Sequence, residues 1–479
     1  MMARTSKGKN HQANLNNETK PSVRATWKLA EGAAAAASAG RRTRQRAARA
    51  HDERYRIAMA LRRMDPRPLT RWLAHAPSAS ALLADHERYR ATFDAKHLGQ
   101  AWYRLGVLTR GSSDERSWLA RNAQRLSLLR MDTLERMGSL DARALCDTAR
   151  GLSWSGLHRL HPQSFWGSLS VAAVKRLDGF TPQGLSGLCC AFAASRARSP
   201  ELIEAVAARA GADLPALVHA DGGAPTLRHV ALLAWAAAAV GLAPRALFSA
   251  LAEAPASWVE RANEHDLGCL GWAFAAADFD APRLFGEPFQ ARAAELEESG
   301  LVSASGRAQL QQWVLWWGLE RGRDVERVPR RVRDAWRDAL SMSHRRRPAD
   351  APRSPMEEQL AATLRALGWA VRPEACVHEG YTLDLLATKP AAPEITVEAD
   401  GRSHYVGVPS RLDHAAATPR AEVHEAGATI LKRRQLRALG RTLLSVPYFE
   451  WEPLAAIDDA RERERAIAAY VASALERAL

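Results

Sequence analysis

The sequence has 479 residues, enough for about three average domains, of which 47% are hydrophobic and 25% are charged. This composition is typical of packed proteins and excludes a chain that is disordered throughout. The formal net charge of +14 favours a polyanionic partner such as nucleic acid. The 5 cysteines form no Cys-x-x-Cys pair, which argues against a zinc ribbon or a disulfide scaffold and indicates a reducing compartment. The longest uncharged apolar run, residues 230–243, is shorter than the roughly 20 residues of a membrane helix, so no membrane partner is expected.

The first 50 residues are strongly basic, with eleven lysines and arginines against two glutamates. One interpretation is a disordered, solvated tail. The other is an organellar transit peptide, because Ala, Ser, Thr and Arg recur while acids are scarce. The following residues 51–94 are predicted to form a helical lead-in.

Residues 95–320 are predicted to form degenerate helical repeats, because they are rich in Ala, Leu and Trp and poor in β-branched residues. An apolar triplet with the spacing i, i+3, i+7 recurs at a period of about 42 residues, which places its side chains on one helical face. The triplets are Leu98/Ala101/Leu105, Leu145/Thr148/Leu152, Leu185/Leu188/Phe192, Val230/Leu233/Ala237, Leu267/Leu270/Phe274 and Leu310/Trp313/Trp317. One period fits two short helices, and such pairs stack into an α-solenoid because a lone pair cannot bury its apolar stripe. The alternative is an irregular helical domain, in which the apolar stripes of the helices form the hydrophobic core without a repeat.

Residues 321–353 contain eleven arginines against five acids and are predicted to be a basic linker. After the linker, residues 354–475 are expected to form a small α/β domain. Ser354 and Pro355 followed by Glu357 have the pattern of a helix start. The expected elements are a helix, two strands, a helix and a strand, over residues 356–367, 381–387, 394–400, 426–440 and 441–448.

Several separate motifs in this domain form a specific set. They are Val397-Glu398-Ala399-Asp400-Gly401, His404, Leu431-Lys432-Arg433-Arg434, Leu436, Gly440, Val446-Pro447-Tyr448 and Trp451. The set resembles the RAP domain, a small RNA-binding domain abundant in apicomplexans and found at the C-terminus of many mitochondrial and chloroplast RNA-metabolism proteins. Such proteins commonly carry upstream helical repeats of the octotricopeptide or FAST-kinase-like kind, and residues 95–320 look like a degenerate version of these.

Basic side chains gather at the end of the same domain, with aromatic residues close by in sequence. Guanidinium groups meet phosphates and aromatic rings stack on bases, so this combination suits single-stranded RNA. On a helix, Arg433 and Arg437 share a face. We expect Trp451 to belong to the core. The candidate RNA-binding residues are Lys432, Arg433, Arg434, Arg437, Arg441 and Tyr448.

The RAP domain is also similar to the restriction-endonuclease-like fold, which implies a second interpretation. A metal-dependent phosphodiesterase holds Mg²⁺ between carboxylates on adjacent strands. Asp384, Glu398 and Asp400 fit that placement as catalytic and metal-binding residues, with His404 as acid, base or orienting group. The nuclease pattern has a lysine where this chain has Asp400, unless Lys432 reaches in from the following helix. The plainer alternative is that Glu398 and Asp400 are strand-end acids that pair with arginines.

We therefore expect an RNA-binding protein of a mitochondrion or chloroplast that acts in transcript stability, processing, splicing or translation. Its expected partners are single-stranded RNA and proteins of a ribonucleoprotein or organellar granule, and it needs no cofactor. The first alternative is an endonuclease acting on RNA or DNA through Asp384, Glu398 and Asp400, which would require Mg²⁺. A second alternative is a scaffold whose solenoid binds another protein.

Overall fold

The structure, a computed structural model, describes residues 67–156, 163–219, 223–344, 353–407 and 423–479. The predictions for residues 1–66, including the transit peptide, lie outside these ranges. The described residues from Leu73 to Leu479 belong to one compact unit, called the larger unit below. Among the helices of these described ranges, none is both long enough and apolar enough to cross a bilayer.

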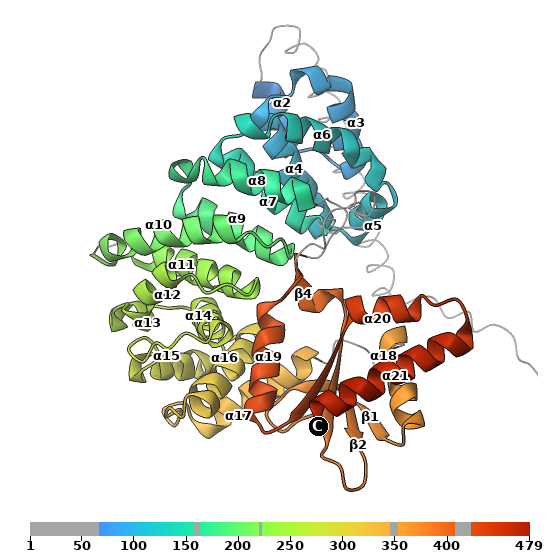
Figure 1. Ribbon diagram of the computed structural model, residues 1–479. Coiled ribbons are helices and arrows are strands. Elements are labelled where there is room, and N and C mark those ends of the chain that lie inside the picture. Colours follow the sequence, from blue (N-terminus) through green and yellow to red (C-terminus); the bar gives the residue numbers. More distant parts are fainter. Residues whose placement is uncertain (1–66, 157–162, 220–222, 345–352, 408–422) are drawn as a thin grey trace, which may run out of the picture. The chain divides into compact units, whose positions relative to one another are not determined.

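Helices that stack in series run through the larger unit and form what we call the first layer (Figure 1). Each carries one of the predicted triplets, and every triplet residue is buried. The N-terminal region is therefore helical and its packing is consistent with helical repeats. Trp317 of the last triplet lies in a π-helical turn, η6 (Leu315–Glu320). The first-layer helices are α4 (Ala95–Gly111), α7 (Ala142–Trp154), α9 (Pro182–Ala194), α11 (Gly223–Ala239), α14 (Glu264–Ala277) and α16 (Ala304–Val314).

Polar side chains fix the starts of most first-layer helices at the same repeat position. Asp94, Asp141, Thr181 and Asn263 each stand four residues before the first triplet residue of their helix. Each side chain accepts a hydrogen bond from a backbone N–H of the first turn. Such a cap contributes about 1 kcal/mol to helix stability.

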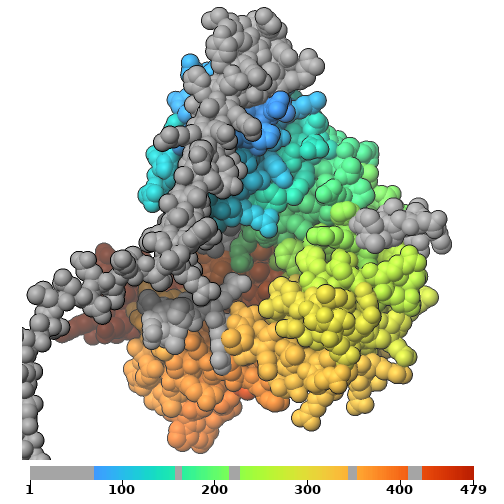
Figure 2. Space-filling view, turned by 180° about the vertical axis from the view of Figure 1, so that it is seen from behind, coloured from blue at the N-terminus to red at the C-terminus, as the bar shows by residue number. Residues whose placement is uncertain are grey.

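The remaining helices of the array form a second layer, in which α8 contacts α10, α10 contacts α12, α13 contacts α15 and α15 contacts α17. Figure 2 shows the colours following one another in sequence order from blue through green to yellow, as serial stacking requires. The second-layer helices are α5 (Ser113–Arg121), α6 (Ser127–Glu135), α8 (Gln163–Val174), α10 (Pro200–His219), α12 (Arg245–Ala252), α13 (Ala256–Glu260), α15 (Glu287–Glu298) and α17 (Arg330–His344). The array is preceded by α2 (Arg67–Ala74) and α3 (Ala79–Tyr89), and short 3₁₀ turns are η1 (Arg90–Thr92), η2 (Ala123–Leu126), η3 (Met137–Ser139) and η5 (Leu177–Gly179).

Glycines permit the closest approach between neighbouring first-layer helices. A Cβ atom at Gly151 of α7 would lie 2.0 Å from the carbonyl oxygen of Trp102 in α4. A Cβ atom at Gly106 of α4 would in turn lie 2.7 Å from the Cα of Gly151. Because real Cβ atoms do not approach backbone so closely, α4 and α7 need glycine at both positions.

The segment predicted as a basic linker contains helix α17, which packs against α16. Val332, Trp336 and Leu340 follow a spacing of i, i+4, i+8, and all three are buried. The Trp336 indole N–H donates a hydrogen bond to Glu297 at 3.0 Å. This corrects the linker prediction for residues 330–344: the arginines lie around an apolar stripe that closes the end of the array.

The C-terminal domain is built on a small mixed sheet with the strand order β1-β2-β3-β6. β1 pairs with β2 and β2 with β3 in antiparallel fashion, whereas β3 and β6 are parallel. The expected elements are present within one or two residues, and Ser354 caps α18 as its motif predicts. Strand β1, the two-residue pair β4–β5 and the last two helices were not predicted from the sequence. The elements are α18 (Pro355–Ala366), β1 (Ala370–Cys376), β2 (Thr382–Thr388), β3 (Ile395–Asp400), η7 (Arg402–His404), β4 (Tyr405–Val406), β5 (His424–Glu425), α19 (Gly427–Ala438), β6 (Thr442–Pro447), α20 (Tyr448–Ala455) and α21 (Ala460–Ala478).

The two faces of the sheet are covered by different parts of the chain. On one face, α18, α20 and α21 enclose a core that includes Leu385, Val397 and Trp451, the last as predicted. On the other face, Leu386 of β2 and Leu436 of α19 share a core with residues of α16, η6 and α17. The array therefore completes the hydrophobic core of the C-terminal domain.

Candidate nucleic-acid interface

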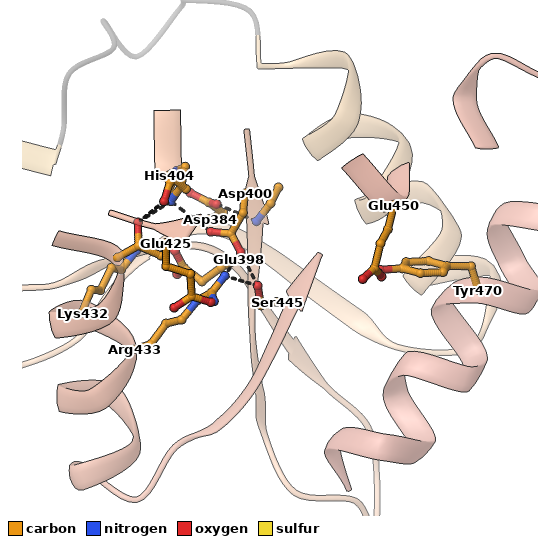
Figure 3. A network of polar contacts seen from close by, with 12 residues as sticks. Asp384, Glu398, Asp400, His404, Glu425, Lys432, Arg433, Ser445, Glu450 and Tyr470 are labelled. Atoms are coloured by element: carbon orange, nitrogen blue, oxygen red, sulfur yellow. Dashed lines mark hydrogen bonds and ion pairs between the residues drawn. The ribbon is translucent and has the colours of Figure 1, made fainter. Parts of the chain in front are cut away.

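The acids singled out in the sequence meet on the sheet face that lies under α19 (Figure 3). Asp384 comes from β2, and Glu398 and Asp400 come from β3. Side chains two apart on a strand point to the same face. Glu398 and Asp400 accordingly both reach cations of α19. The predicted gathering of these acids is confirmed.

Asp384 is held by the backbone of the neighbouring strand. Its Oδ2 accepts a hydrogen bond from the Ala399 N–H at 2.8 Å. Burial raises the pKa of Asp384, while the charge of Lys432 and the Ala399 hydrogen bond act in the opposite direction. The carboxyl thus helps to join β2 to β3.

Glu398 is almost completely buried and pairs with Lys432 of α19. Burial raises the pKa of Glu398 to about 7, because the attraction of Lys432 does not outweigh the loss of water and the nearby charges of Asp384 and Asp400. Its second oxygen, Oε1, has no hydrogen-bond partner among the described residues. Lys432 thus reaches from α19 to an acid of β3, where it forms an ion pair.

The pKa of Asp400 shifts in the opposite direction to that of Glu398. His404 Nδ1 lies 3.0 Å from its Oδ1, and both Arg433 and the Ser445 hydroxyl donate to its Oδ2. Burial by itself raises the pKa of Asp400, but the bonds from His404, Arg433 and Ser445 outweigh it and hold the pKa below its ordinary range. His404 therefore orients a buried carboxylate.

Arg433 lies inside the domain, with its side chain only 9% exposed. Its guanidinium pairs with Asp400 and Glu425 and bonds to Ser445. A buried guanidinium needs these partners, since a buried unpaired charge is strongly destabilising. Arg433 serves the fold, which corrects its expected role as an RNA contact.

Arg434 faces the array. It pairs with Glu320 of η6 and donates to the carbonyl oxygen of Ala275 in α14. The Lys432 and Arg434 side chains are 14% and 24% exposed, so most of their surface is already in contact with the protein. Lys432, Arg433 and Arg434, which were predicted to bind RNA, are thus in contact with acids and carbonyl groups of the protein itself.

Of the two other arginines, Arg437 lies in the last turn of α19 and Arg441 follows the end of that helix. Arg441 pairs with Glu394 at 2.8 Å on the surface. Arg437 is exposed and makes no ion pair within the described residues. RNA contact by Arg437 and Arg441 stays a prediction.

Tyr448 belongs to an aromatic cluster at the start of α20. The ring is buried between Tyr405 and Phe449, with centroid distances of 5.6 and 5.4 Å. The Arg402 guanidinium lies over the Tyr448 ring at 4.6 Å. Phe449, which is 41% exposed, presents the accessible part of this cluster.

The geometry gives no support to the endonuclease alternative. The described residues contain no group of three or more His, Cys, Asp or Glu side chains placed to hold a metal ion. Instead, Lys432 neutralises Glu398 and Arg433 neutralises Asp400. Asp384, Glu398 and Asp400 are members of a buried network of ion pairs and hydrogen bonds, which agrees with the plainer alternative for Glu398 and Asp400.

This network lies in the part of the chain that a known family accounts for. Residues 397–469 match the family model of the RAP domain. The RAP match begins on β3, contains α19, β6 and α20, and ends within α21. Asp384 and the first two strands precede it. No curated protein matches the chain.

The residues that attach the C-terminal domain to the array were not predicted from the sequence. The Tyr381 hydroxyl donates to Gln435 at 2.6 Å and accepts from Gln312 at 2.9 Å, and Gln435 donates to the Gln312 carbonyl at 2.7 Å. All three residues are buried. Gln435 stands on the apolar stripe of α19 beside Leu431 and Leu436, and a glutamine at a core position was the signal for a buried polar contact.

Proposed function

We propose that this protein binds single-stranded RNA and acts in post-transcriptional RNA metabolism, in the stability, processing, splicing or translation of transcripts. The observation that carries the proposal is the RAP domain at residues 397–469, placed after a helical-repeat array. The net charge of +14 supports a polyanionic ligand.

Location and further partners belong to the same proposal. The basic composition of residues 1–50, with Ala, Ser and Arg abundant, supports import into a mitochondrion or chloroplast. Proteins of a ribonucleoprotein or organellar granule are the proposed protein partners. The proposal also takes the C-terminal domain as a binding version of the restriction-endonuclease-like fold, supported by the acids on neighbouring strands β2 and β3.

Fluorescence anisotropy with the full chain tests RNA binding directly. A labelled single-stranded RNA would be titrated at several salt concentrations, with double-stranded DNA of the same sequence as the comparison. For three or more neutralised phosphates, a fourfold rise in salt should weaken RNA binding by about tenfold or more. Absence of RNA binding, or binding that salt does not affect, would count against the proposal.

Charge reversal at Arg433 is unsuitable for this test. The variant would leave Asp400 and Glu425 without their buried partner and would disturb the fold whatever the ligand. Arg437→Glu changes an exposed arginine on the same helix instead. A loss of RNA affinity in Arg437→Glu would assign an RNA contact to α19.

A further inference from the structure

The first-layer helices have a face opposite their buried triplets. Counting from the first triplet residue as i, positions i−2 and i+5 fall on that face, because a helix turns by about 100° per residue. On α4, α7, α9 and α11 these positions remain open to solvent in full or in part. We call this face of the four helices the open strip.

Position i−2 forms a row that is mostly cationic. All four side chains are exposed, and they are Lys96, Arg143, Gln183 and Arg228. Lys96 and Arg228 make no ion pair within the described ranges. Arg143 lies 3.6 Å from Asp147, and its side chain is 88% exposed. Three positive charges thus lie along one edge of the strip.

Position i+5 forms a second row, which is rich in flat groups. Its members are Tyr103, Arg150, Cys190 and Trp235, all partly exposed. The Arg150 guanidinium lies 5.6 Å from the centre of the Tyr103 ring and 4.6 Å from that of Trp154. Arg110, which is exposed, lies 5.1 Å over the same Trp154 ring. Guanidinium planes and aromatic rings in this arrangement offer stacking surfaces to nucleobases.

The spacing of the two rows fits a nucleotide. Seven residues along a helix correspond to about 10 Å, which is the scale on which a nucleotide extends from its phosphate to the outer edge of its base. Neighbouring first-layer helices repeat both rows side by side. A strand lying across the helices can therefore place phosphates on one row and bases on the other.

The C-terminal domain covers the continuation of this face. Gln312 of α16 is buried against Tyr381, and the Arg434 side chain reaches the end of α14. A Cβ atom at Gly427, the first residue of α19, would lie 1.9 Å from the carbonyl oxygen of Ala238 in α11. The open strip therefore ends where the RAP domain begins, and its free part spans α4 to α11.

We propose that single-stranded RNA lies along the open strip, with phosphates at Lys96, Arg143 and Arg228 and bases stacked at Tyr103, Trp154 and Trp235. This inference rests on the proposed function and assigns the main RNA contact to the array. On α19, Lys432, Arg433 and Arg434 are already paired with Glu398, Asp400 and Glu320, which leaves Arg437 as the exposed cation of that helix.

A charge variant tests the phosphate row in the full chain. Lys96→Gln/Arg143→Gln/Arg228→Gln removes three exposed charges, so RNA affinity should fall at least tenfold at low salt. The slope of log affinity against log salt should become shallower by about 2. The matched control, Arg327→Gln/Arg330→Gln/Arg331→Gln, removes three exposed charges from α17 and the loop before it and should change RNA affinity less than about twofold.

An aromatic variant tests the base row. Tyr103→Leu/Trp235→Leu keeps apolar side chains at both positions, so it should lower RNA affinity at least about fivefold while leaving the salt slope unchanged. Circular dichroism would verify that each variant is folded. If this variant fails to fold, the charge variant still tests whether RNA lies along the open strip.

The two proposals fail in different ways. If the native protein binds RNA with the expected salt dependence and the folded strip variants bind equally well, the open strip is not the RNA site and the proposed function stands. If the native protein binds no RNA, the proposed function itself fails.

Discussion

At the scale of single residues, Glu398 and Asp400 have opposite pKa shifts although they are neighbours on one strand. Asp400 receives bonds from Arg433, His404 and Ser445, which hold its pKa down. Glu398 is equally buried but, among the described residues, pairs with Lys432 alone, so burial dominates and its pKa rises. The number of donors around each carboxylate decides the direction.

The raised pKa of Glu398 predicts a specific pH dependence of stability. The folded pKa of about 7 lies above the ordinary value of 4.5, so the contribution is fully present below about pH 4.5 and is lost as pH rises through about 7. Between pH 5 and pH 8, the free energy of unfolding should fall through this group by at most about 3 kcal/mol. Urea denaturation should show this fall in the native protein and a smaller one in Glu398→Gln.

Exposed Glu394 provides the control. It pairs with Arg441 on the surface, where ion pairs contribute little. Glu394→Gln should therefore follow the native pH profile. Identical pH profiles for Glu398→Gln and the native protein would contradict the assignment.

At the scale of helices and strands, short-range patterns predicted the elements well. The triplets located all the first-layer helices because helical periodicity is a local property of the sequence. The caps Asp94, Asp141, Thr181 and Asn263 recur in the same register and are a second local signal of the repeat. Helix α17 was missed because its arginines hid the spacing of Val332, Trp336 and Leu340.

Gly151→Ala tests the contact between neighbouring repeats. The new Cβ atom would collide with the Trp102 carbonyl, so α4 and α7 must separate and the free energy of unfolding should fall by about 1–3 kcal/mol. Gly167→Ala is the matched control, since a Cβ atom there meets nothing within 4 Å. It should leave stability unchanged or raise it by about 0.5–1 kcal/mol. Thermal unfolding measures both, and equal shifts would contradict the close approach.

At the scale of the larger unit, the array and the RAP domain share one core. Leu386 and Leu436 pack against residues of α16, η6 and α17, and the Tyr381–Gln312–Gln435 network crosses the same boundary. The sheet would expose an apolar face if the array were removed. We therefore expect residues 73–479 to unfold in a single cooperative transition.

Tyr381→Phe tests this coupling. Loss of the hydroxyl leaves the Gln312 side-chain N–H and the Gln435 side-chain oxygen without the partner that they have in the native protein, which should cost about 1–3 kcal/mol. Hydrogen exchange should accelerate to a similar extent in α14 and in β3. Tyr470→Phe, which removes a hydroxyl bonded to exposed Glu450, should cost less than about 1 kcal/mol (Figure 3). Faster exchange confined to one side of the boundary would contradict a shared core.

The sequence by itself determined the helical register, the strands that carry the acids and the RAP motif set, because each depends on residues close together in the chain. Only the tertiary structure decided which cations are free. Arg434 pairs with Glu320, 114 positions away, and Arg433 pairs with Asp400, 33 positions away. Charge compensation depends on distance in space, so Arg433 and Arg434, on a helix that suits RNA by composition, are instead paired with acids, whereas Lys96, Arg143 and Arg228 of the array are exposed.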